Sequence, residues 1–162
     1  MAVELMRIDD RLIHGQVVVG WGQPLDIGFI VLVDDEVANS DWEQELYRMG
    51  VPPEMEVRFA SVDEAAISLP DYERDPRRGI VLTGDIASMR RLVEANGHVR
   101  RINLGGIHHR TGRVQRLRYV FLTPEEESEL RELAERGIDI TAQDVPSARP
   151  IPLTDVLNGS AS

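Results

Sequence analysis

The chain contains no cysteine, which excludes disulfide bonds, thiolate metal sites and a cysteine nucleophile. It has no apolar run near the roughly 20 residues that a membrane helix requires, so we expect it not to cross a membrane by itself. The N-terminus lacks the basic segment, apolar stretch and cleavage site of a secretory signal, which makes the cytoplasm the expected location. Basic residues are outnumbered by acidic ones, 18 to 28, and the net charge of −10 argues against nucleic acid as the main partner.

The 162 residues, 42% of them hydrophobic, suit one globular domain with a sizeable core. Short apolar runs alternate with segments of helical period, and no internal repeat or linker interrupts them. This pattern predicts an α/β fold with a single-domain, open, mainly parallel β-sheet and helices on both faces. We place the domain at residues 1–157 and expect a flexible tail at 158–162.

Apolar runs and turn signals predict the individual elements. Strands are expected at 3–8, 27–33, 56–60, 79–83, 101–104, 119–122 and, as the last one, 138–142. Helices are expected at 16–21, at 42–49 after a Ser40-Asp41 cap, after the capping box of Ser61, at 88–94 with a C-cap near Asn96-Gly97, and from Thr123 to Arg136. The polar segment 70–78, which holds two prolines, is expected to be an exposed loop.

Several polar segments follow predicted strands. In an open parallel sheet, ligand sites gather outside the carboxyl ends of the strands. Residues 9–15, 34–35, 83–85 and 104–108 are therefore expected to converge on one edge of the sheet.

The stretch Arg7–Val17, RIDDRLIHGQV, places His14 between a loop rich in Arg and Asp and a predicted helix start. A histidine with the ordinary pKa of about 6.5 offers a neutral, nucleophilic nitrogen near physiological pH. Arg11 can hold phosphate oxygens through two parallel hydrogen bonds, and Gly15 lets backbone amides approach an anion. An isolated histidine is more often a packed, structural residue, but these surroundings favour a phosphorylated imidazole.

Other chemistries find less support. The adjacent His108 and His109, alone or with His98, would point to opposite faces of an extended segment, and no H-E-x-x-H accompanies them, so no metal site is expected. No G-x-S-x-G motif is present. Gly105-Gly106 lacks a nucleotide-binding pattern and is typical of a tight turn. Asp9-Asp10 is either a carboxylate pair or a turn-forming pair.

A cluster of basic residues occupies the segment around His108 and His109. It is either an ordinary solvated face or a surface that docks an acidic or phosphorylated partner. Its arginines are Arg100, Arg101, Arg110, Arg113, Arg116 and Arg118.

The stretch Arg7–Val17 resembles the phosphorylation-site signature of the IIB component of the mannose/fructose/sorbose class of the bacterial sugar phosphotransferase system. Segments 30–37, IVLVDDEV, and 102–107, INLGGI, are similar to the corresponding segments of that family. The resemblance covers nearly the whole chain.

The resemblance implies an enzyme, a phosphocarrier whose His14 accepts a phosphoryl group from a IIA phosphohistidine and passes it to incoming sugar at a IIC/IID membrane complex. Arg11 would stabilise the phosphoryl group, Asp10 would help hold the loop, and Gly15 with Gln16 would supply close backbone approach. Supporting positions in the site would be Arg7, Asp9, Gly105 and Gly106. The family uses no metal or organic cofactor for this transfer. Contact with the inner face of the membrane would come through the partners, and association of several copies is left open.

Two departures from the family keep a second function open. Val18–Gly22 is less polar than the matching segment of sugar-transporting members, and His108-His109-Arg110 adds basic groups. The alternative is a phosphorylation-dependent regulatory or binding protein of an incomplete system that passes no phosphate to sugar.

Overall fold

The apolar run at 27–33 forms the most deeply buried strand of the protein, β2 (Ile27–Val33). The computed structural model describes residues 2–97 and 99–158, and only the backbone of Gln16 and Val17. Phe29, Val31 and Val33 face one hydrophobic core, while Ile30 and Leu32 face a second one on the other side of the sheet. A strand of this kind is buried on both faces, as the sequence predicts for a parallel sheet.

Seven strands form one sheet in the order β3-β2-β4-β1-β5-β8-β9. All neighbouring pairs are parallel except β8 and β9. The predicted single-domain, mainly parallel α/β sheet is therefore confirmed, and the ends of the strands at 3–8, 56–60 and 101–104 lie where the sequence places them. The other strands are β1 (Val3–Ile8), β3 (Glu56–Ala60), β4 (Arg78–Thr83), β5 (Arg101–Leu104), β8 (Asp139–Ala142) and β9 (Ile151–Pro152).

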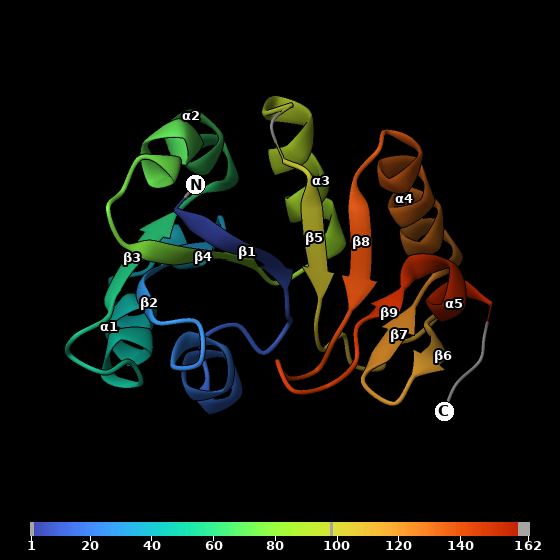
Figure 1. Cartoon of the computed structure of the whole chain (residues 1–162), viewed down its shortest axis with the longest axis horizontal. Coiled ribbons are helices and arrows are strands. Elements are labelled where there is room, and N and C mark those ends of the chain that lie inside the picture. The colour runs from blue at the N-terminus through green and yellow to red at the C-terminus, as the bar shows by residue number, and fades with distance from the viewer. Residues whose placement is uncertain (1, 98, 159–162) are drawn as a thin grey trace.

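Helices cover both faces of this sheet (Figure 1). One face carries α2 (Val62–Glu73), α3 (Ile86–Ala95) and α4 (Pro124–Glu135), whose apolar side chains enter the larger core. The other carries a π-helical turn, η1 (Gln16–Gly22), a 3₁₀ turn, η2 (Val37–Asn39), and α1 (Asp41–Met49). Within η1, Val18 and Trp21 are buried in the smaller core, which accounts for the apolar character of these two positions, whereas Val19 is half exposed.

Side-chain caps begin three of the helices. Ser61 and Thr123 each form a complete capping box, and Asp85 accepts a hydrogen bond from the Ser88 backbone. Asp85 therefore starts α3 at Ile86, two residues before the predicted start. Ser40 precedes α1 but makes no side-chain cap, contrary to the prediction.

The prediction of an exposed loop at 70–78 is wrong, because α2 continues through Pro70 to Glu73 and β4 begins at Arg78. Proline in a helix removes one backbone hydrogen bond. Here Leu69 and Tyr72, on either side of Pro70, are buried in the larger core and keep the last turn helical. Helix α3 ends at Ala95 with Asn96 as its C-cap, as the sequence predicts, and Gly137 after α4 has a φ of +93°.

The predicted last strand is followed by β9 and by α5 (Leu153–Leu157), so β8 is not the last. A hairpin of β6 (Val114–Leu117) and β7 (Val120–Leu122) forms a second, two-stranded sheet, of which the sequence predicted only the second strand. The domain boundary at 157 stays a prediction, and the expected tail lies, apart from Asn158, outside the described residues.

Candidate functional site

The loop after β1 lies between the ends of its two neighbours in the sheet. The Asp9 backbone N–H donates to the Thr83 carbonyl at the end of β4, and the Asp10 N–H donates to the Gly106 carbonyl beyond β5. The connections that leave β1 and β4 pass on opposite faces of the sheet, through η1 and α3. Ligands of open α/β sheets bind outside the carboxyl ends of two neighbouring strands whose connections leave over opposite faces in this way. Residues 9–15, 83–85 and 104–108 thus converge as predicted.

Asp9 is the centre of this loop. Its buried carboxylate accepts hydrogen bonds from Arg11 Nε at 3.0 Å and Arg11 Nη2 at 2.9 Å, and one from Arg7 Nη2 at 3.1 Å. His14 Nε2 lies 3.9 Å from Asp9 Oδ1. Burial alone would raise the pKa of Asp9, but the Arg11 hydrogen bonds and both guanidinium charges outweigh it and hold the pKa below its usual value. Asp9 is therefore a carboxylate at any physiological pH.

Arg7 is fully buried beneath the loop. Its guanidinium donates to the Asn103 side-chain oxygen, to the Gln143 carbonyl at 2.9 Å and to the Asp144 carbonyl at 3.2 Å. It also lies 4.6 Å from the centre of the Trp21 ring, a cation–π distance. The structure thus places Arg7 as a support for Asp9 and not at the surface, where a phosphate group would arrive.

The loop backbone is strained at one residue. Leu12 has a φ of +59°, in the left-handed region that non-glycine residues rarely adopt. Two hydrogen bonds to Asp9 hold the turn: the Arg11 N–H donates to its carboxylate at 3.1 Å, and the Leu12 N–H donates to its carbonyl at 3.0 Å. Asp9 therefore fixes the backbone of the loop as well as its side chains.

His14 follows this turn and is one quarter exposed. Partial burial lowers the pKa of the imidazole, and the positive charges of Arg11 and Arg7 lower it further, against the opposing effects of Asp9 and Asp10. The imidazole is accordingly neutral at physiological pH and keeps a nucleophilic nitrogen. Arg11, whose pKa is raised mainly by its hydrogen bond to Asp9, stays charged beside it and is about one third exposed.

The carboxylate of Asp10 contacts the loop after β5. It lies 2.5 Å from His108 Nδ1 and accepts the His108 backbone N–H at 2.8 Å. Asp10 thus connects the loops that follow β1 and β5. The adjacent His109 packs edge-on against Phe121, 5.6 Å between ring centres, so the two histidines do point to different surroundings.

The glycines of the predicted site have different neighbours. A Cβ on Gly105 would lie 2.5 Å from Arg7 Cζ and 2.7 Å from Asp9 Oδ2, and one on Gly106 would lie 3.1 Å from Arg11 Nε. These two glycines leave room for the arginines. Chain neighbours and the backbone of η1 apart, no described residue has a heavy atom within 4 Å of the Cβ position at Gly15, so the backbone before η1 has room for an approaching group. The side chain of Gln16, which the sequence places at the phosphate, is outside the described residues.

The basic cluster around His108 and His109 divides into three parts. Arg100 and Arg101 lie at the start of β5, the opposite edge of the sheet from His14. Arg113 and Arg116 form ion pairs with Glu126 and Glu127 of α4, at 2.8 and 2.6 Å.

The third part of the cluster consists of Arg110 and Arg118, which are exposed at the edge of the sheet that carries His14. Arg110 forms no ion pair among residues 2–97 and 99–158. Arg118 lies 3.4 Å from Asp144, which is also 3.7 Å from Arg11.

Other predicted positions lie outside the site. Asp34 accepts the backbone N–H groups of Glu36 and Val37, and Asp35 accepts that of Val62 and pairs with Arg91, so neither reaches His14. Among the described residues no group of three His, Asp or Glu side chains is placed to hold a metal ion, and His98 is not described. No helix in residues 2–97 and 99–158 is long and apolar enough to span a membrane.

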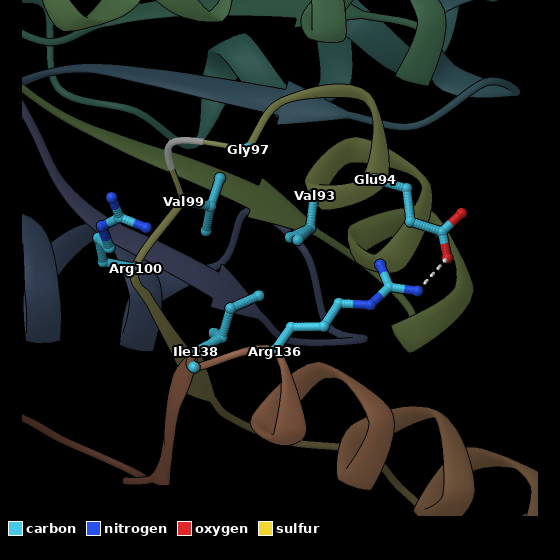
Figure 2. Close-up of a pocket in the computed structure, with 8 residues that line it drawn as sticks. Val93, Glu94, Gly97, Val99, Arg100, Arg136 and Ile138 are labelled. Atoms are coloured by element: carbon cyan, nitrogen blue, oxygen red, sulfur yellow. Dashed lines mark ion pairs between the residues drawn. The ribbon is translucent and has the colours of Figure 1, made fainter.

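A cavity of about 260 Å³ lies at the other end of the sheet, away from His14 (Figure 2). Val93 and Ile138 are among its lining residues, and Figure 2 shows Arg136 extended toward Glu94, to which it is paired at 3.7 Å. The carboxyl ends of α3 and α4 border this cavity, and helix carboxyl ends carry partial negative charge. A phosphoryl group is therefore better accommodated at the loop of His14.

Sequence reasoning missed four residues that surround Arg7: Trp21, Asn103, Gln143 and Asp144. Asn103 is a buried polar residue in the apolar strand β5, and Gln143 and Asp144 directly follow β8. The position of all three at carboxyl ends of parallel strands is a signal that identifies them in principle.

The sequence model of the PTS system sorbose subfamily IIB component matches residues 3–162. The chain belongs to this IIB family. The N-acetylgalactosamine-specific phosphotransferase enzyme IIB component 1 of Escherichia coli is 32% identical over 145 residues, which are 88% of this chain and 90% of that protein. The sorbose-specific EIIB component of Klebsiella pneumoniae is 29% identical and aligns with 99% of this chain and 98% of its own length.

Solved structures show the same relationship. The crystal structure of the IIBSor domain of the sorbose permease from Klebsiella pneumoniae superposes with a TM-score of 0.88 at 29% identity, covering 99% of each chain. The resemblance drawn from Arg7–Val17 is therefore confirmed. IIB components act as phosphotransferases in sugar transport, and this IIB chain shares their sequence family and fold.

Proposed function

We propose that this IIB chain is a cytoplasmic phosphocarrier, with His14 as the residue that bears the phosphoryl group. The observation that carries the proposal is geometric: the buried carboxylate of Asp9 binds the guanidinium of Arg11 at 2.9 Å and lies 3.9 Å from the imidazole of His14. The lowered pKa of His14 is consistent with a neutral, nucleophilic ring. In the transfer, a nitrogen lone pair of His14 attacks phosphorus while the bond from phosphorus to the donor nitrogen breaks. No cofactor takes part in this exchange, and catalysis rests on positioning and charge.

The attacking nitrogen in this proposal is Nδ1. His14 Nε2 is enclosed by protein and lies 3.9 Å from Asp9 Oδ1. A carboxylate on that side favours the tautomer with its proton on Nε2, which leaves the lone pair on Nδ1. The same carboxylate steadies the ring after phosphorylation, because Nε2 keeps its proton. Nitrogen-15 correlation spectra of the phosphorylated protein distinguish the two positions.

Arg11 stabilises the transferring group. Its guanidinium is oriented by two hydrogen bonds to Asp9 and is partly open to solvent, so it can meet phosphoryl oxygens as negative charge spreads over them. Asp10 keeps the loops after β1 and β5 together through His108, and the open backbone at Gly15 adds amide groups on the side of His14.

The partners follow from the family. The donor is a IIA phosphohistidine, and the acceptor is sugar at a IIC/IID membrane complex, which holds the chain at the inner face of the membrane. Nucleic acid is not a partner in this proposal. Support comes from relatives named for sorbose, mannose and N-acetylgalactosamine, among which a mannose-specific EIIAB component matches over 49% of its own length.

The experiment supplies radiolabelled, phosphorylated IIA protein, then membranes that contain a sorbose-class IIC/IID pair and sugar. We expect label to move to the chain and then to sugar, and His14→Ala to block both steps. Label that stays on His14 in the presence of permease and sugar would contradict the second step and support the regulatory alternative. Label on the His14→Ala variant would remove His14 from the proposal.

A further inference from the structure

Helix α1 turns its apolar side toward solvent. Trp42, Leu46 and Met49 are 67%, 56% and 82% exposed, and no residue of the helix is buried. Their spacing of four and three residues places them on one side of an α-helix. Of the six large apolar side chains that the described part of the chain exposes, these make up half. We call these three residues the α1 stripe.

The opposite side of α1 is held to the protein by polar and aromatic contacts. Gln44 Nε2 donates to the Val37 and Ala38 carbonyls at 3.0 and 3.2 Å, and Tyr47 lies 6.5 Å from Phe59, ring centre to ring centre. The helix is therefore fixed in its orientation without using its most apolar residues. Single exposed apolar side chains are ordinary, but an apolar row on one helix is typical of an interaction site.

Charge around the α1 stripe defines the chemistry of its occupant. The helix carries three acidic residues, Asp41, Glu43 and Glu45, and one basic residue, Arg48, which pairs with Glu45 at 2.8 Å and leaves the border of the stripe net acidic. A second copy of the chain would bring the same acidic border and a net charge of −10, and an anionic lipid surface would be repelled. A basic partner with an apolar side complements both the acidic border and the apolar α1 stripe.

The α1 stripe also lies on the side of the sheet that carries η1. Both α1 and η1 pack on the smaller core, and Figure 1 shows them on the same face, with Val19 of η1 half exposed as well. Because α1 begins beyond the carboxyl end of β2, Trp42 is at the edge of the sheet where His14 lies. One partner lying along this face can therefore approach both.

We propose that the α1 stripe docks a basic, amphipathic segment of a membrane protein, lying on its cytoplasmic side. Such segments carry an excess of Lys and Arg. The proposal rests on the proposed function in that the transfer to sugar brings the chain to a membrane permease. It adds that α1 is the surface by which the chain is held there, with the acidic border matching the basic loops and the stripe covering their apolar side.

The test measures binding of a labelled, 14-residue leucine–lysine peptide that forms an amphipathic helix. The full-length protein is compared with a triple variant, Trp42→Gln with Leu46→Gln and Met49→Gln. The matched control is Ile67→Gln with Val114→Gln, which removes exposed apolar side chains elsewhere. We expect the peptide to bind the unmodified protein and the control alike, and the triple variant at least about tenfold more weakly. In the unmodified protein, emission of Trp42 should shift to the blue as it is covered, since the only other tryptophan, Trp21, is already buried.

Two further peptides separate docking from general attraction to an acidic protein. A peptide of the same composition with a scrambled, non-amphipathic order, and one with glutamate in place of lysine, are both expected to bind at least about tenfold more weakly. Equal binding of the scrambled peptide, or equal binding of the helical peptide to the triple variant, would overturn the proposal.

The other occupants are tested with the same variants. Sedimentation that shows a dimer lost in the triple variant would assign the α1 stripe to a second copy. Binding to vesicles of phosphatidylcholine and phosphatidylglycerol, lost in the triple variant, would assign it to lipid. Either result overturns the proposal.

Labelling of His14 by phosphorylated IIA is measured on the same preparations, which keeps the two proposals apart. We expect the triple variant to be labelled as fast as the unmodified protein. Intact labelling with lost peptide binding supports the docking surface, whereas labelling lost in the triple variant alone would assign the α1 stripe to the phosphoryl donor and overturn it.

Discussion

At the scale of single residues, the two adjacent aspartates have separate tasks. Asp9 holds Arg7, Arg11 and the strained turn, whereas Asp10 reaches His108 on the neighbouring loop. The family resemblance gives Asp10 the task of holding the loop and Asp9 only a supporting position. Side chains alternate between the two sides of β1, so Asp9, two residues after Arg7, lies on the same side as Arg7 and hydrogen-bonds to it. The burial of Arg7, which makes Asp9 the supporting carboxylate, is visible only once the fold is known.

Arg11 is expected to contribute both charge and geometry to phosphoryl transfer. Arg11→Lys keeps the charge but loses the paired hydrogen bonds, so the rate from phosphorylated IIA should fall about tenfold. Arg11→Gln should lower it by roughly 10²–10³, as for the loss of one transition-state donor. Rapid-quench labelling measures both rates, with Arg110→Gln as the control because Arg110 is exposed and lies in no ion pair of the described chain. Rates that do not change would exclude Arg11 from the site.

The lowered pKa of His14 predicts an unusual pH profile. Because only the neutral imidazole attacks phosphorus, the labelling rate should stay level as the pH falls through about 6.5, the ordinary value, and decline only below it. In Arg11→Gln the imidazolium loses a repelling charge, so the midpoint should move up toward that value. Proton NMR titration of the His14 ring measures the pKa directly. A midpoint above 6.5 in the unmodified protein would contradict the electrostatics described here.

At the scale of elements, the loop after β5 is shaped to admit the arginines. Gly105→Ala would place a methyl group against Arg7 and Asp9. We expect it to lower the free energy of unfolding by about 1–3 kcal/mol, as overpacking does, and to slow labelling of His14. Urea denaturation measures the first effect. Gly97→Ala is the control, since among the described residues, its chain neighbours apart, none has a heavy atom within 4 Å of that Cβ position. Equal stabilities of the two variants would show that Gly105 is not tightly packed.

Buried parallel strands could be predicted from the sequence more closely than the elements at the periphery. Continuous apolar runs such as Ile27–Val33 indicate a strand buried on both faces, and capping boxes at Ser61 and Thr123 fix helix starts. Pro70 misled the prediction because tertiary packing overrides a local breaker. The strand Val114–Leu117 alternates weakly and depends on its pairing with Val120–Leu122, which no local pattern shows.

At the scale of the whole molecule, the Asp9 and Arg7 pair joins β1 to β5 and to the segment after β8. Asp9→Asn leaves a buried guanidinium without its carboxylate, and we expect a loss of about 3–5 kcal/mol in the free energy of unfolding. Thermal and urea unfolding measure it. Asp139→Asn, at an exposed position, should change stability by less than about 0.5 kcal/mol. A similar small change for Asp9→Asn would mean that Asp9 serves catalysis alone.

The arrangement of the whole chain also separates two surfaces. The proposed phosphoryl chemistry lies at the loop after β1, while the α1 stripe is exposed to solvent on the face that carries η1. All 18 basic residues are arginine, so Arg11→Lys introduces a unique lysine side chain, and its amine can be followed by selective modification.

The most direct measurement is the mass of the intact chain and of its peptides after incubation with phosphorylated IIA. We predict the addition of one phosphoryl group, labile to acid as phosphohistidine is, carried by the peptide that contains His14. His14→Ala should gain none, while a variant of the exposed His109, His109→Ala, should gain as much as the unmodified protein. A phosphoryl group on any other residue, or none on the folded chain, would contradict the assignment of His14.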